Sequence, residues 1–293
     1  MTAALSAINR RDSQARDDRS IGALLIDAGK LRPEDAEQIL RLQKAEGLRF
    51  GEAAVRLGLA SEADIQHALA RQFDYPYLQP GEGTVSESLV AAYRPFSPQV
   101  EALRALRSQL MLRWFNAEYG RKALAIASPA RGEGRSFLAA NLAIVFSQLG
   151  ERTLLIDADM RAPRQHALFG FDYRGGLSTF LSGRDETPAL ARIPMLADLT
   201  VMPAGPVPPN PQELLGRPAF ANLLANLAVE YDVILIDTPA VESGADAQAI
   251  AAHAGAALLL ARKDHTALAA LQGLSTGLQE AGAKVLGAVL TDF

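Results

Sequence analysis

The stretch that decides the fold runs from Ala123 to Ala127 (ALAIA) and on through Ser128 to Ser136 (SPARGEGRS). Its first part is a short apolar run of the kind that forms a buried strand. Its second part is a glycine-containing loop, followed by a helix-like segment from Ser136 to Gln148. A loop between a strand and a helix turns backbone N–H groups and the positive helix end toward phosphate. The stretch therefore predicts a phosphate-binding loop.

This loop matches the pattern G-x-x-x-x-G-K-[ST] at only part of its fixed positions. Gly134 and Ser136 agree with the pattern, whereas Pro129 replaces the first glycine and Arg135 replaces the lysine. Arginine keeps the positive charge but is a longer, planar fork, whereas lysine is a compact point charge. The loop alone is weak evidence of nucleotide binding, so the rest of the chain has to decide.

Two other apolar runs end in an aspartate, at Asp157 and Asp237. In a protein with a phosphate-binding loop, such aspartates can hold Mg²⁺ together with the loop hydroxyl of Ser136. Asp159 lies two residues after Asp157, so an extended chain puts both side chains on one side, where Asp159 can accept a proton from a hydroxyl. A single strand-end aspartate is equally well explained as a helix cap, but two of them after a glycine-rich loop favour a metal site.

Strand-like and helix-like segments alternate through the second part of the chain. The strand-like runs are 123–127, 153–157, 200–203, 233–237, 256–261 and 285–290. Short apolar strands separated by helices predict an α/β fold, a P-loop NTPase with a mostly parallel sheet covered by helices on both faces. Ligands of such sheets bind beyond the carboxyl ends of the strands, and the motifs fall at those ends.

An internal repeat marks a separate domain nearer the start of the chain. Ile21-Gly22 recurs 29 residues later as Phe50-Gly51, and each copy continues into a helix ending near a glutamine. We therefore expect four regions. These are a disordered tail (1–19), a small helical repeat domain (20–78), a turn-rich linker (79–96) and a nucleotide-binding domain (97–293).

Composition excludes several classes of function. With 49% hydrophobic and 21% charged residues, the 293-residue chain is globular. Its net charge of −4 argues against a nucleic-acid partner, and the lack of cysteine excludes disulfides and cysteine-based zinc sites. No apolar run reaches the roughly 18 residues of a membrane span, and the segment from Met1 to Ser20 is too polar for a signal peptide. We expect a cytoplasmic chain that reaches the membrane only through a partner.

Several motifs resemble those of the bacterial tyrosine kinases. Gly132–Ser136 (GEGRS), Leu155–Pro163 (LIDADMRAP) and Ile236–Pro239 (IDTP) resemble the Walker A, A′ and B motifs of that family. Pro206–Leu215 is similar to its proline-rich segment, and the order and spacing agree over residues 97–293. The chain resembles in particular the exopolysaccharide chain-length determinant tyrosine kinases of the EpsG type.

The resemblance implies an autophosphorylating protein-tyrosine kinase that uses ATP and Mg²⁺ and regulates exopolysaccharide chain length, polymerisation and export. The implied nucleotide-binding residues are Arg131, Gly132, Glu133, Gly134, Arg135, Ser136 and Phe137. The implied catalytic residues are Arg135, Asp157 and Asp159, and the implied metal ligands are Ser136, Asp157 and Asp237.

The resemblance also implies partners. Glu101, Arg104 and Arg107 match the family's oligomerisation signature, and their spacing puts them on one helix face. The family interpretation is a ring contact with the next subunit, while the simpler one is a solvated charged face. The implied activator is a membrane chain-length determinant (Wzz-like) protein, whose cytoplasmic tail recruits the chain to the inner face of the plasma membrane.

Two departures from the family pattern leave other functions open. Arg135 stands at the catalytic lysine position, and the six tyrosines form no cluster near Phe293. Both features favour a nucleotide-binding scaffold with little kinase activity. If the chain does phosphorylate tyrosine, the scattered tyrosines predict an internal acceptor or an acceptor in another protein. A partitioning ATPase of the ParA or MinD type is a third hypothesis, disfavoured because Ala130 replaces its signature lysine.

The N-terminal repeat resembles the N-terminal domain of type II secretion and pilus-assembly ATPases. Some of these bind cyclic di-GMP through an Arg-Leu-Gly start and a downstream glutamine. The second copy offers Arg49-Phe50-Gly51 with Gln72, but the first offers Ser20-Ile21-Gly22 with Gln43 and lacks the arginine. The alternative is a small helical docking module without a nucleotide.

Overall fold

A computed structural model describes residues 20–72, 76–78, 81, 83–115, 120–194 and 196–292. The chain divides into two compact units, a helical unit (Met1–Pro76) and a sheet unit (Tyr77–Phe293). The predicted disordered tail, 1–19, lies outside the described residues. Of the helices in the described ranges, none combines the length and apolar composition that crossing a bilayer requires.

The helical unit confirms that the N-terminal region is helical. Its helices are α1 (Ile21–Asp27), α2 (Pro33–Glu46), α3 (Phe50–Arg56) and α4 (Glu62–Gln72). The repeat is visible at the start of the second helix in each copy. There the N–H of Arg32 donates to Asp35 at 3.0 Å, and the N–H of Ser61 donates to Asp64 at 3.0 Å. Helix α1 packs on α4 and α2 packs on α3, around a core of leucine, isoleucine and alanine.

The sheet unit contains seven strands in the order β3-β4-β2-β5-β1-β6-β7. They are β1 (Ala123–Ala127), β2 (Thr153–Asp157), β3 (Ala191–Arg192), β4 (Leu199–Met202), β5 (Val233–Asp237), β6 (Ala256–Arg262) and β7 (Lys284–Thr291). All neighbours pair in parallel except β3, which is antiparallel to β4. The mostly parallel sheet is therefore confirmed. The short strand β3 was not predicted, because two residues carry no periodic pattern.

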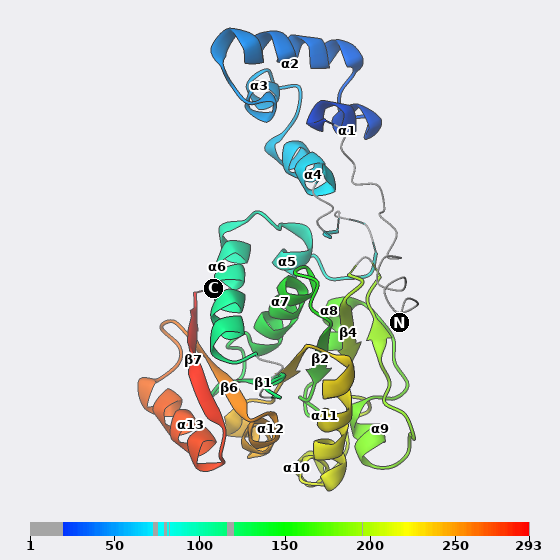
Figure 1. Ribbon diagram of the computed structural model, residues 1–293. Helices are drawn as coiled ribbons and strands as arrows, with labels where there is room; N and C mark the ends of the chain where they lie inside the picture. Colours follow the sequence, from blue (N-terminus) through cyan, green and yellow to red (C-terminus); the bar gives the residue numbers. More distant parts are fainter. Residues whose placement is uncertain are drawn as a thin grey trace, which may run out of the picture. The chain divides into compact units, whose positions relative to one another are not determined.

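Helices cover both faces of this sheet (Figure 1). One face carries α5 (Val90–Tyr93), α6 (Pro98–Arg113) and α7 (Arg135–Ser147), and the other carries α9 (Leu177–Leu181), α10 (Pro211–Leu215), α11 (Pro218–Glu230), α12 (Asp246–Ala254) and α13 (Leu268–Glu280). Alternate residues of β1 serve the two cores, Leu124 and Ile126 on the first face and Ala125 and Ala127 on the second. Burial on both faces explains why the strands are continuous apolar runs.

The segment predicted as a linker, 79–96, differs from expectation. Leu89 and Ala92 are fully buried in the core of the sheet unit. The N–H of Ala91 donates to the side chain of Asn141 in α7 at 2.9 Å, and the hydroxyl of Tyr93 donates to the Val85 carbonyl at 2.6 Å. The boundary between the units lies at Pro76, and the sheet unit begins before residue 97. The glycines near residue 80 indicated a linker, but the apolar residues that follow decide how the segment packs.

Candidate functional site

The strand order brings the predicted motifs to one edge of the sheet. Strand β5 lies between β2 and β1, so the carboxyl ends of these three parallel strands are neighbours. In the register, Asp157 of β2 lies beside Asp237 of β5, and Asp237 lies beside Ile126 near the end of β1. The glycine-containing loop follows β1 directly. The structure therefore places the loop and both strand-end aspartates together.

The loop is held by its own side chains. Gly132 and Gly134 adopt positive φ angles of 75° and 95°, a conformation that favours glycine, and α7 begins at Arg135. The fully buried carboxylate of Glu133 accepts the N–H of Ala130 at 2.8 Å and the hydroxyl of Thr266. These contacts fix the loop from inside, so Glu133 has a structural role in addition to its place in the predicted nucleotide site.

The guanidinium group of Arg135 is turned onto the protein's own oxygen atoms. Its Nε donates to the Thr238 carbonyl at 2.9 Å, and its Nη1 donates to the Ala130 carbonyl at 2.7 Å and to the Ser128 hydroxyl. The residue is 7% exposed. Next in the loop, the N–H of Arg131 donates to the carboxylate of Glu242 at 2.8 Å. Arg135 thus lies in the loop as predicted, with its Nε and Nη1 donors bound to the chain's own oxygen atoms.

The two strand-end carboxylates each keep one oxygen atom unused. Asp157 Oδ2 accepts the N–H groups of Arg164 at 3.0 Å and Gln165 at 2.9 Å, and Asp237 Oδ2 accepts the side-chain amide of Gln165 at 2.8 Å. In the described part of the chain, the other oxygens, Asp157 Oδ1 and Asp237 Oδ1, are buried without a hydrogen-bond partner. Buried acceptors are normally paired, so these atoms point to a missing cation or donor.

Burial also changes the acidity of this pair. It raises the pKa of Asp157 well above its usual range, and the neighbouring charge of Asp237 adds to the effect. Burial raises the pKa of Asp237 to about 6, although the Ser136 hydroxyl and the Gln165 amide, which favour the charged carboxylate, oppose the rise. A divalent cation would remove this repulsion. Two carboxylates and the hydroxyl of Ser136 are the hard oxygen donors that Mg²⁺ prefers, and Mg²⁺ retains several waters, so the residues present fit the ion.

Asp159 follows at the end of β2, on a loop that it helps to shape. Its Oδ1 accepts the N–H groups of Arg161 at 3.2 Å and Ala162 at 2.9 Å. Arg161 in turn forms an ion pair with Asp246, the fully buried first residue of α12, at 2.6 Å. The loop after β2 is thereby tied to the start of α12.

The three residues of the predicted oligomerisation face do not share one environment. On α6, the exposed carboxylate of Glu101 pairs with Arg104. Arg107 instead points toward α7, where its Nη1 donates to the Val145 carbonyl at 2.6 Å. Arg107 therefore holds α6 on α7 within its own chain, and of the other two only Glu101 is exposed, because the side chain of Arg104 is mostly covered.

Sequence reasoning missed Gln165 and Glu242. Gln165 is fully buried between the two aspartates, and Glu242 accepts the N–H of Arg131 from the loop after β5. Neither residue belongs to a sequence motif that predicts a binding or catalytic role. The position of Gln165 just after Leu155–Pro163 was the only available signal.

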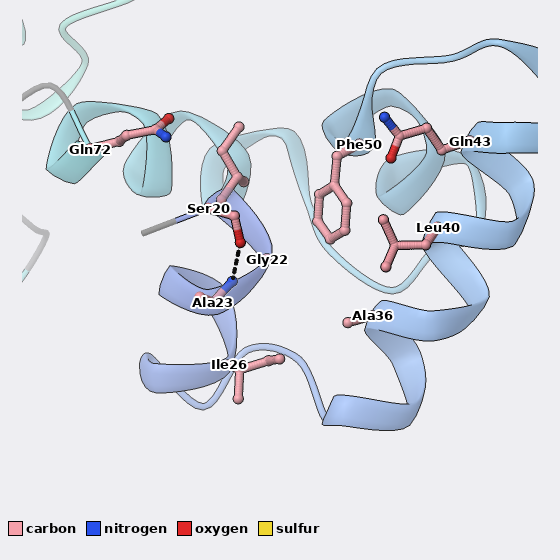
Figure 2. A pocket seen from close by; sticks show the side chains of 10 residues that line it. Ser20, Gly22, Ala23, Ile26, Ala36, Leu40, Gln43, Phe50 and Gln72 are labelled. Carbon is pink, nitrogen blue, oxygen red and sulfur yellow. Dashed lines mark hydrogen bonds between the residues drawn. The ribbon is translucent and has the colours of Figure 1, made fainter. Parts of the chain in front are cut away.

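The helical unit has a pocket of its own, with a volume of about 530 Å³ (Figure 2). Gln43 and Gln72, the matching glutamines of the two repeat copies, both line it, together with Phe50, Leu40 and the start of α1. Its remaining lining is mostly apolar. Arg49, the arginine on which the cyclic di-GMP interpretation depends, precedes α3, and its N–H donates to Glu52 at 2.9 Å.

Known proteins match the sheet unit. A family profile described as "Cellulose biosynthesis protein BcsQ" matches residues 122–281. Tyrosine-protein kinase Wzc of Salmonella typhimurium is 37% identical over 205 residues, which are 70% of this chain and 28% of Wzc. Tyrosine-protein kinase YwqD of Bacillus subtilis is 31% identical over 206 residues, 70% of this chain and 86% of YwqD. The kinase domain of the Escherichia coli tyrosine kinase ETK is similar in structure, with a TM-score of 0.66 and 32% identity over 70% of this chain and 79% of that domain.

Proposed function

The chain belongs to the bacterial tyrosine-kinase family, and from this premise we propose that its sheet unit is an ATP- and Mg²⁺-dependent protein-tyrosine kinase. The observation that carries the proposal is the adjacent, buried pair Asp157 and Asp237, each with an unused oxygen, beside a phosphate-binding loop. Such a pair destabilises the fold unless a cation meets it. Because the chain spans 28% of Wzc, the activity of that whole protein is a proposal here.

In this proposal the residues of the site bind the phosphates, hold the metal ion and accept a proton. The backbone N–H groups from Arg131 to Phe137 hold the phosphates, with Arg135 supplying positive charge. Ser136, Asp157 and Asp237 hold Mg²⁺, which neutralises phosphate charge when bound. Asp159 accepts the proton of the attacking tyrosine hydroxyl.

A nucleotide-binding scaffold with little kinase activity is the second candidate, and the position of Arg135 favours it. Its guanidinium group is bound to Thr238 and Ala130 carbonyls, so it has to leave these contacts before it reaches a phosphate. A misplacement of about 1 Å costs about a hundredfold in rate. A partitioning ATPase of the MinD type stays the least supported hypothesis, because Ala130 replaces the signature lysine.

Transfer of the γ-phosphate from labelled ATP by the purified full chain tests the proposal. We expect Arg135→Lys to raise the rate about tenfold or more, because the compact ammonium fits the position that the guanidinium fork overfills. Arg131→Lys, a change at an exposed arginine of the same loop, is the matched control. Transfer by the wild type supports the kinase. A silent wild type with an active Arg135→Lys variant supports the scaffold. If neither the wild type nor Arg135→Lys transfers phosphate, the kinase proposal is contradicted.

The partners follow from the same premise. We propose that the cytoplasmic tail of a membrane chain-length determinant activates the chain and recruits it to the inner face of the membrane. The match to a cellulose biosynthesis family supports a task in polysaccharide assembly. A peptide of such a tail, added to the transfer assay, should raise the rate, and no change in rate would contradict the proposal.

We propose further that Glu101 and Arg104 contact the next subunit in a ring. The exposed position of Glu101 supports this contact. Sedimentation of the full chain with and without nucleotide measures the assembly, and a monomer under every condition would contradict it.

For the helical unit we propose a docking role, with cyclic di-GMP as the second candidate ligand. The docking interpretation is supported by the mostly apolar lining of the pocket. Cyclic di-GMP is supported by the convergence of Gln43 and Gln72 on that pocket. Titration of the full chain with cyclic di-GMP separates the two, because binding that Gln72→Ala abolishes would replace the docking interpretation.

A further inference from the structure

Gln165 contacts every residue proposed to hold the metal ion. Its backbone N–H donates to Asp157 Oδ2 at 2.9 Å. Its side-chain Nε2 donates to Asp237 Oδ2 at 2.8 Å and to the Ser136 carbonyl at 3.1 Å. These three partners come from β2, β5 and the first turn of α7. One fully buried residue thus connects the three segments that form the site, its backbone N–H reaching β2 and its side chain reaching β5 and α7.

These contacts determine which way the amide points. Both hydrogens of Nε2 are directed at acceptors, so a flipped amide would set Oε1 against the Ser136 carbonyl and the Asp237 carboxylate. The observed orientation leaves Gln165 Oε1 buried without a hydrogen-bond partner in the described ranges. Asp157 Oδ1 and Asp237 Oδ1 are orphaned in the same way. Three unpaired oxygens therefore lie on Gln165 and on the two aspartates to which it donates.

Unpaired buried oxygens are unfavourable in the free protein, each by about 1–3 kcal/mol. Three such oxygens on Gln165 and the two aspartates that it contacts are explained if another group satisfies them. A hydrated divalent cation does so, because it offers positive charge to the carboxylates and water hydrogens to the amide oxygen.

We infer that Gln165 is the positioning residue of the metal site: it holds Asp157 and Asp237 so that each presents one oxygen to a divalent cation, and its own Oε1 is a third acceptor there. The inference rests on the proposed function, since it assigns a task within the same site. A residue of this kind contributes about tenfold to a hundredfold in metal affinity.

The test compares ADP binding in Mg²⁺ and in EDTA for the wild type and for Gln165→Met, which keeps the side-chain volume and removes both polar atoms. We expect Mg²⁺ to tighten ADP binding by the wild type, and the variant to lose about tenfold of that gain while its Kd in EDTA is unchanged. The matched control is Asn141→Leu, which removes a buried amide from α7 that donates to Phe137 and accepts from Ala91. It should lower the Tm and keep the full Mg²⁺ gain.

Loss of stability in Gln165→Met with an undiminished Mg²⁺ gain would overturn the inference, since Gln165 would then serve packing only. A second readout, titration of the nucleotide-free full chain with Mn²⁺ followed by electron paramagnetic resonance, needs no nucleotide. It should show about tenfold weaker Mn²⁺ binding in Gln165→Met. A wild type that binds no ADP would contradict the proposed function, and the Mn²⁺ comparison would still decide the task of Gln165. Equal Mn²⁺ affinity in both proteins would overturn it.

Discussion

The carboxylates of Asp157 and Asp237 suit the site to a cation but lower the stability of the fold. Both are fully buried, and they lie side by side at the ends of β2 and β5. Burial of two like charges in a low-dielectric interior raises the pKa values of both carboxyl groups. Because each carboxyl group ionises less easily in the folded chain than in the unfolded chain, its ionisation lowers the stability of the fold. A site of this kind is stabilised by its ligand, as is usual where binding groups have been arranged before the ligand arrives.

The pH dependence of stability gives a prediction for Asp237. Its pKa is about 6 in the folded chain against an ordinary value of 3.8, so at low pH both states are protonated and nothing is lost. As the pH rises, the unfolded chain ionises first, and the stability of the folded state falls until the pH passes the folded pKa. Asp237→Asn should therefore raise the free energy of unfolding of the nucleotide-free chain by about 1–3 kcal/mol at pH 7 and by little at pH 4.

Chemical denaturation at the two pH values measures this effect. The control is Asp232→Asn, because the hydrogen bond from Arg152 lowers the pKa of Asp232 and the same substitution there should reduce stability at pH 7. An Asp237→Asn variant less stable than the wild type at pH 7 would show that the carboxylate is satisfied by the fold alone.

Helix α8 (Gln165–Phe169) connects the candidate site to the rest of the sheet unit. It begins with Gln165 and ends just before Gly170, which has a φ angle of 66°. The segment expected to be a linker passes over this end, where the N–H of Ser86 donates to the Leu168 carbonyl at 2.8 Å. The chain before α6 thus supports a helix that meets the aspartates.

Gly170→Ala tests how tightly these segments meet. A Cβ atom at Gly170 would lie 1.8 Å from the Thr84 carbonyl oxygen, and the left-handed backbone adds strain. We expect a loss of about 2–4 kcal/mol in the free energy of unfolding, measured by urea denaturation. Gly183→Ala is the control, because Gly183 has a φ angle of 75° with nothing within 4 Å and should lose only about 1 kcal/mol. Equal losses in both variants would mean that the contact at Thr84 contributes nothing.

At the scale of the whole molecule, the chain is two compact units joined near Pro76. The core of the sheet unit includes Leu78, Leu89 and Tyr93, which precede the kinase-like motifs. Removing them uncovers apolar surface of α7 and exposes the amide of Asn141, which accepts from Ala91. The nucleotide-binding part therefore extends further toward the N-terminus than its motifs do.

Two fragments test this boundary. We expect residues 77–293 to unfold cooperatively and to bind ADP as the full chain does, whereas residues 97–293 should lose several kcal/mol of stability or aggregate, because buried side chains of α5 are missing. Thermal unfolding followed by circular dichroism measures both. If the 97–293 fragment is as stable as the 77–293 fragment, residues 79–96 contribute nothing to the core and the linker prediction is correct.

Much of the fold and of the site followed from local pattern. The apolar runs predicted six strands to within a residue at each end, and Asp157 and Asp237 marked two strand ends that are neighbours in the sheet. Strand length, alternation of burial and loop chemistry are properties of neighbouring residues, so they can be predicted from one sequence. The helical repeat was visible for the same reason.

The direction in which individual side chains point depended on folding. Arg135 meets Thr238, which is 103 positions away, and Arg107 meets Val145, which is 38 positions away. Gln165 became a member of the site only because β2, β5 and α7 meet at the same edge of the sheet. Such contacts join segments distant in the chain, and no local pattern encodes them. The residue types at the site were thus present in the sequence, while the packing of the sheet selected which of their atoms are left for a ligand.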